Sequence, residues 1–147
     1  MLVFRLTLPR FADSLVASGT ANRWNSAGRL VIYTAFSRSL ACLEKVVHTR
    51  PVEITTPLRM LLIDVPDELT REELPALPAM AQTSAENAAT RALGDEWLDS
   101  QRSVILAVPS AIIPQEINYL LNPAHPDFAR IQLVGTEDFR FDSRLKE

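Results

Sequence analysis

The chain has 147 residues, of which 47% are apolar and 22% are charged, and its net charge is −3. This length and composition are typical of one globular domain built around one core. Its fifteen Lys and Arg residues are scattered along an acidic chain, so direct binding to nucleic acid is not expected.

The first 66 residues predict, in chain order, a strand, an irregular segment, a second strand, a helix and a third strand. The strands are expected at residues 2–8, 29–36 and 58–66, where apolar and β-branched side chains alternate or form continuous runs. The helix is expected to begin at Ser37 or Ser39, either of which can act as N-cap, and to stop before Pro51.

The remaining residues predict two helices and further strands. A short acidic helix is expected where Thr70 and Glu73 have capping-box spacing, followed by a loop over 75–83. A longer helix is expected over 84–100, with Ser84 as its cap and Gly94 as a candidate interruption. The last segments are a buried strand, a turn-rich stretch and a final strand or two, at residues 103–112, 118–128 and 130–142. The expected class is α/β or α+β, a single domain with a mixed sheet flanked by helices.

No metal site, membrane span or export signal is evident in the sequence. The two histidines are far apart and have no cysteine cluster near them. The single cysteine excludes an intrachain disulfide, and no apolar run approaches the ~20 residues that span a bilayer. A cytoplasmic protein is expected.

Glu44 is the first candidate for chemistry. A helical wheel puts three apolar residues of its helix on one stripe, which is expected to pack on the sheet: Leu40, Leu43 and Val47. Glu44 lies at the edge of that stripe, so its carboxylate should be half-buried and near the strand that carries Tyr33. The alternative is a solvated glutamate paired with His48.

Other candidates also have structural alternatives. Arg23 beside Trp24 could make a cation–π contact, and Tyr33 could be a core aromatic whose hydroxyl reaches water. Ser110 follows a buried strand and could be a turn serine, with Ser103 as the competing candidate. Three further polar residues are interpreted as structural: Asn118, Asn122 and His125. Neither a Ser-His-Asp triad nor a pair of carboxylates can be assembled from these residues.

Four segments in this order resemble the RES-domain toxins, a family named for a shared arginine, glutamate and serine. The segments are RWNSAGRLVIY, SRSLACLEKVVH, LAVPSAIIPQEINYLLNPAHPDF and EDFRFDSRL, and an N-terminal FRLT also fits. The resemblance covers nearly the whole chain, so residues 1–147 are expected to form one RES domain. It implies a fold like that of ADP-ribosyltransferases and an enzyme that degrades NAD+ by hydrolysis or phosphorolysis.

The resemblance also implies roles for particular residues. The family arginine, tyrosine and glutamate correspond to Arg23, Tyr33 and Glu44. The family serine corresponds to Ser110, with Ser103 as the alternative, and Arg5 is an early arginine that helps hold phosphate. In these roles the arginine binds the pyrophosphate or an attacking phosphate, and the tyrosine stacks on nicotinamide. The glutamate stabilises an oxocarbenium-like transition state, and the serine donates a hydrogen bond to a ribose or phosphate oxygen.

By the same resemblance, NAD+ is a consumed substrate and no resident cofactor is needed, with inorganic phosphate as a candidate co-substrate. The expected partner is an Xre-like antitoxin of a type II toxin–antitoxin pair, and homodimerisation within that complex is a further expectation. Two alternatives stay open: transfer of ADP-ribose to a protein, and a domain that binds a partner without catalysis.

Overall fold

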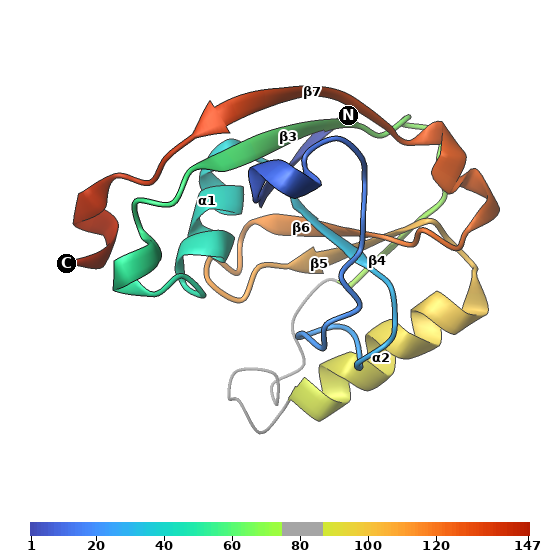
Figure 1. Cartoon of the computed structure of the whole chain (residues 1–147). Coiled ribbons are helices and arrows are strands. Elements are labelled where there is room, and N and C mark those ends of the chain that lie inside the picture. The colour runs from blue at the N-terminus through green and yellow to red at the C-terminus, as the bar shows by residue number, and fades with distance from the viewer. Residues whose placement is uncertain (75–86) are drawn as a thin grey trace.

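The computed structural model describes residues 1–74 and 87–147, which form a mixed sheet and two α-helices, the expected α+β class (Figure 1). The strands are β1 (Leu2–Thr7), β2 (Ile32–Ala35), β3 (Leu58–Asp64), β4 (Arg71–Glu73), β5 (Ile105–Pro109), β6 (Ile117–Leu121) and β7 (Gln132–Phe139). The helices are α1 (Arg38–Val46) and α2 (Asn87–Ser100), and short 3-10 turns occupy Pro9–Phe11, Pro51–Glu53, Pro126–Arg130 and Ser143–Lys146. Within the described residues, no helix is both long and apolar enough to cross a membrane.

The sheet has the order β4-β5-β6-β2-β1-β3-β7. Every neighbouring pair is antiparallel except β4 and β5, which are parallel. β1 and β2 are paired at a single position, Phe4 with Ala35, whereas six residue pairs join β1 to β3. The sheet is therefore weakly joined at its centre, and β3 and β7 arch above β5 and β6 in Figure 1. A sheet that parts in this way leaves room between its two halves.

Each helix packs against a different half of the sheet. The buried face of α1 belongs to a cluster with side chains of β1 and β3, which includes Leu40, Ala41, Val46, Phe4, Leu6 and Met60. Trp97 and Leu98 of α2 pack with Leu106 and Val108 of β5 and with Leu120 of β6. Burial of these apolar side chains supplies the main stabilisation of both helices.

Most expected elements are confirmed with narrower bounds. All five predicted strands are present, and the last of them is a single strand, β7. Ser37 is the N-cap of α1, where its hydroxyl accepts a hydrogen bond from the Leu40 amide at 3.1 Å. The predicted packing stripe of α1 is partly wrong, because Val47 is 48% exposed and Val46 is buried in its place. Val47 is the C-cap and keeps helical backbone angles, so its exposure reflects the rotation of the helix, which turns Val46 and not Val47 toward the core.

Two predictions about secondary structure are wrong. The acidic segment around Thr70 and Glu73 is not a helix, because residues 71–73 form the edge strand β4 and pair with β5. The hydrogen bonds that residues 71–73 form with the buried strand β5 outweigh the helix-capping pattern of Thr70 and Glu73. The turn-rich segment is also misassigned at its start, since Ile117–Leu121 forms β6 between β2 and β5. The predicted loop over 75–83 and the Ser84 cap lie outside the described residues.

Candidate active site

A cavity of about 470 Å³ lies where β1 and β2 part. Its wall includes residues 4–6 of β1, residues 33–35 of β2, part of α1 and the segment that follows β5. This volume is within the range of small-molecule sites, about 300–1,000 Å³. Four of the predicted site residues line it, each from a different part of the chain: Arg5, Arg23, Tyr33 and Glu44.

Glu44 is half-buried on α1, as predicted. Its Oε1 accepts a hydrogen bond from Ser110 Oγ at 2.7 Å and another from Asn118 Nδ2 at 2.6 Å. The alternative pairing with His48 is not found among the described contacts, although His48 also lines the cavity. Glu44 is therefore held from the β5–β6 side of the cavity and not by its own helix.

Ser110 directly follows β5 and is fully buried, with an exposure of 0%. Its Oγ accepts hydrogen bonds from the amides of Ile112 at 3.0 Å and Ile113 at 3.1 Å, in a serine turn. Its hydroxyl has one proton, which forms the hydrogen bond to Oε1 of Glu44. The hydroxyl predicted to donate to a ribose or phosphate oxygen therefore has protein partners for its proton and for both lone pairs in this structure.

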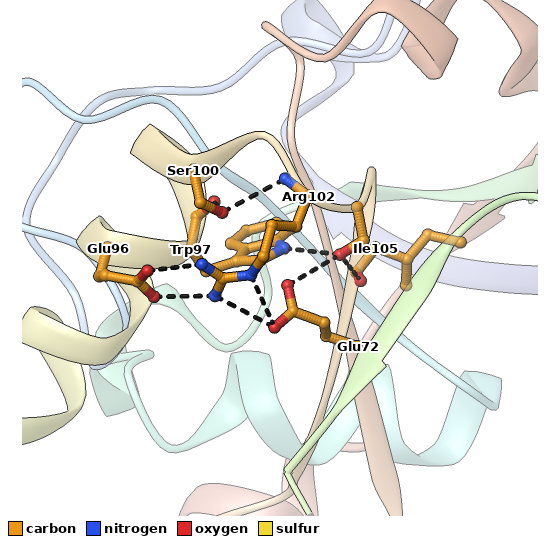
Figure 2. Close-up of polar contacts among 7 residues, drawn as sticks. Glu72, Glu96, Trp97, Ser100, Arg102 and Ile105 are labelled. Atoms are coloured by element: carbon orange, nitrogen blue, oxygen red, sulfur yellow. Dashed lines mark hydrogen bonds and ion pairs between the residues drawn. The ribbon is translucent and has the colours of Figure 1, made fainter.

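Ser103, the alternative serine, precedes β5 and does not line the cavity. Its hydroxyl is 2.9 Å from the indole Nε1 of Trp97, which donates to it, and 2.9 Å from the carbonyl of Ile105. Figure 2 shows the surrounding cluster, in which Arg102 forms ion pairs with Glu96 and Glu72. The structure therefore does not bring Ser103 to the cavity, and its contacts are those of a structural residue.

Tyr33 contributes its ring to the cavity wall while its hydroxyl is tied to the preceding loop. The hydroxyl donates to Asn25 Oδ1 at 2.5 Å and accepts from the backbone amide of Trp24 at 3.2 Å. Burial raises the pKa of the Tyr33 phenol above its ordinary value, and the hydrogen bond from Trp24 only partly offsets this effect. The phenol is therefore neutral at physiological pH and keeps the proton that it shares with Asn25.

Arg5 reaches across the gap between β1 and β2. Its Nη1 donates to the carbonyl oxygen of Tyr33 at 3.2 Å, and the side chain lines the cavity. Burial lowers the pKa of the Arg5 guanidinium, although Arg remains charged at any physiological pH. A partly buried cation is thus available on the wall of the cavity.

Arg23 is half-buried on the cavity wall, in a loop that is docked on α2. The Thr90 hydroxyl donates to the carbonyl of Arg23, and Arg91 Nε donates to the carbonyl of Asn22 at 2.8 Å. Gly94 does not interrupt α2, contrary to one interpretation of the sequence. A Cβ atom at Gly94 would lie 1.7 Å from the carbonyl oxygen of Trp24, so only glycine permits this approach of helix and loop.

Sequence reasoning placed Asn118 among the structural residues, and the structure puts it in the site. Asn118 lies in β6 opposite Ala35 of β2 and Val108 of β5, and its amide contacts Glu44. The signal available in the sequence was that Asn118 lies within residues 117–121, an otherwise apolar run typical of a strand. Asn122 and His125 keep the predicted turn roles, since they accept hydrogen bonds from the amides two residues ahead.

The sequence model of the RES domain family matches residues 3–142. The chain belongs to the RES-domain family. Among its relatives is "Toxin Res" of Pseudomonas putida, 40% identical over 99% of both chains. "Toxin Res" of Photorhabdus laumondii is 38% identical over 99% of this chain and 97% of its own. A third relative is "Prs ADP-ribosylating toxin" of a Sphingobium strain, 38% identical over 91% of this chain and 88% of its own.

Proposed function

We propose that this RES-domain chain is a toxin that consumes NAD+ by cleaving the bond between nicotinamide and ribose. The observation that carries the proposal is the convergence of Arg5, Arg23, Tyr33 and Glu44 on one cavity of small-molecule size. Two cations, an aromatic ring and a carboxylate match a dinucleotide that carries phosphates, a flat ring and a ribose. The toxin names of the relatives support the biological role.

The bond that breaks joins C1′ of the ribose to the ring nitrogen of nicotinamide. Its electron pair goes to that nitrogen, so the pyridinium becomes neutral nicotinamide, and positive charge develops on C1′ and the ring oxygen of ribose. A carboxylate beside the ribose stabilises this oxocarbenium-like state more than the ground state, which is the requirement for catalysis. Glu44 is the carboxylate that lines the cavity, and we assign it this role.

The remaining cavity residues bind and orient the substrate in this proposal. Arg23 binds the pyrophosphate or an attacking phosphate, and Arg5 supplies a second positive charge to the same anionic groups. The Tyr33 ring stacks on nicotinamide and holds the ribose in a reactive geometry. Ser110 acts through Glu44, to which its hydroxyl donates a hydrogen bond. This positioning role replaces the direct contact with substrate that the sequence suggested.

The acceptor that attacks C1′ decides the class of product. Water yields ADP-ribose, nicotinamide and a proton, whereas inorganic phosphate yields nicotinamide and an ADP-ribose that carries the phosphate on this same carbon. A protein side chain is the second candidate acceptor, and it is favoured by the relative named "Prs ADP-ribosylating toxin". All three reactions share the first half, so they need the same four cavity residues.

A toxin of this kind requires a partner that neutralises it. We propose a cognate antitoxin of Xre-like type that covers the cavity and so excludes NAD+. Homodimerisation of the toxin within that complex is part of the same proposal. A domain that only binds its partner is the non-catalytic alternative, and the experiment below separates it from an enzyme.

The test is NAD+ concentration over time with purified chain, with and without inorganic phosphate. Arg23→Ala and Glu44→Gln should each reduce the rate by about 100-fold or more, because each removes a charge aimed at the substrate. Arg144→Ala is the matched control, since Arg144 is exposed, hydrogen bonds to Asp142 and lies outside the cavity wall. Radiolabelled NAD+ added to a cell lysate reports transfer to protein. Full NAD+ consumption by Glu44→Gln would refute its assigned role.

A further inference from the structure

The two carboxylate oxygens of Glu44 have different surroundings. Oε1 accepts hydrogen bonds from Ser110 Oγ at 2.7 Å and Asn118 Nδ2 at 2.6 Å. No residue in the described parts of the chain donates a hydrogen bond to Oε2. Since Glu44 lines the cavity, Oε2 is the oxygen left for a ligand.

The orientation of the Ser110 donor is fixed by its own turn. The amides of Ile112 and Ile113 both donate to its Oγ, so the hydroxyl proton has one remaining direction, toward Glu44. The serine is fully buried, and its backbone is held by Glu116, directly before β6, whose carbonyl accepts a hydrogen bond from the Ser110 amide at 2.8 Å. The first donor to Oε1 is therefore rigid.

The orientation of the Asn118 amide is set by the carboxylate. Its Oδ1 is buried and has no hydrogen-bond partner among the described residues. A flip of the amide would turn Oδ1 toward Glu44 Oε1 and set two acceptors against each other at 2.6 Å. An unpaired buried carbonyl is unfavourable, and a leucine, which has the same branched skeleton, would avoid it. Asn118 thus retains an unfavourable group in order to present a donor to Glu44.

We propose that Asn118 is a positioning residue for the reaction: with Ser110 it fixes Oε1 of Glu44 as an acceptor and leaves Oε2 alone to face the ribose. The inference rests on the proposed function. One carboxylate oxygen is then anchored to β6 and to the residue that follows β5, and the other is aimed at the atom where positive charge develops. Such preorganisation lowers the barrier without improving the binding of the substrate.

The kinetic test is Asn118→Leu, which removes the donor and keeps the branched skeleton of the side chain. The value of kcat should fall by about 10- to 100-fold, while KM for NAD+ changes by less than about threefold, because the lost contact orients a group that acts in the transition state. In a Glu44→Gln background the same substitution should have no further effect. Equal losses in both backgrounds would overturn the inference, since Asn118 would then act independently of Glu44.

Asn122→Leu is the matched control. Asn122 is a buried asparagine directly after β6, its amide donates to the carbonyl of Leu98, and it does not line the cavity. This substitution should lower the unfolding midpoint and leave kcat of the folded protein unchanged. Should Asn118→Leu fail to fold, Asn118→Ala removes the same donor with a smaller side chain and should give the same kinetic pattern.

Nuclear magnetic resonance separates a failure of this inference from a failure of the proposed function. The side-chain amide signals of Asn118, assigned by their loss in Asn118→Leu, should lie downfield and move upfield in Glu44→Gln. Addition of carba-NAD, an uncleavable analogue, should leave them in place, because the ligand uses Oε2. Asn118 signals whose chemical shift is unchanged in Glu44→Gln, or which move upfield with carba-NAD, would overturn the inference. This holds whether or not the wild type consumes NAD+.

Discussion

Replacing Gly94 by alanine tests whether α2 positions the loop that carries Arg23. The new Cβ would lie 1.7 Å from the carbonyl oxygen of Trp24 and 2.7 Å from its carbonyl carbon. Helix and loop must therefore separate by about 1.5 Å to reach an ordinary contact distance. Both neighbours are backbone atoms, so no side chain can rotate away to relieve the overlap.

The effect on stability combines opposing contributions. Alanine favours the helix over glycine by about 1 kcal/mol, whereas overpacking costs about 1–3 kcal/mol. Separation also weakens the hydrogen bonds that Thr90 and Asp95 make with Arg23 and Ser26, each contributing about 1 kcal/mol. The net loss is about 2 kcal/mol, which for a domain of this size lowers Tm by about 4–8 °C.

The effect on turnover should be larger than the effect on stability. Arg23 immediately precedes Trp24, so its side chain moves with the displaced carbonyl, and a misplacement of about 1 Å costs roughly 100-fold in rate. The assay is kcat/KM for NAD+ at a temperature where thermal unfolding shows the variant to be folded. Thr90→Val should give a smaller loss in the same direction, because it removes one hydrogen bond to the loop.

Gly135→Ala is the control for this experiment. A Cβ atom there meets Leu62 at 3.9 Å, an ordinary contact, so stability and turnover should stay close to wild type. A Gly94→Ala protein that is as stable and as active as wild type would refute the reasoning, because the close approach of α2 to the loop would then have no consequence.

Two further predictions concern Ser103 and Tyr33. Ser103→Ala should leave NAD+ turnover unchanged and lower the free energy of unfolding by about 1–3 kcal/mol, because the buried indole of Trp97 loses its acceptor; loss of turnover in the folded variant would contradict the structural role. Burial raises the pKa of the Tyr33 phenol, so the folded state keeps a proton that the unfolded state loses above about pH 10. This contribution to stability is complete below about pH 10 and declines at higher pH. Tyr33→Phe should therefore be less stable at neutral pH but lose less stability between about pH 9 and 11, as measured by urea unfolding. Parallel losses in both proteins would exclude this contribution.

Local patterns in the sequence were sufficient for much of the fold. Alternating or continuous runs of apolar residues identified β1, β2, β3, β5 and β7, and Ser37 was among the predicted caps of α1. The half-buried setting of Glu44 also followed from helical spacing. These features depend on residues within one or two turns or one strand, so the neighbouring residues are enough to specify them. The family resemblance then related Arg23 and Tyr33 to the same site.

Only the tertiary structure decided which residues meet at Glu44. Ser110 and Asn118 are 66 and 74 residues away from Glu44 in the chain, and no local pattern encodes a contact over that distance. For the same reason the sequence left Ser103 as an alternative and treated Gly94 as a defect of its helix. The requirement for glycine arises from a carbonyl oxygen at Trp24, seventy residues earlier, that approaches the helix only after both segments have packed on the sheet.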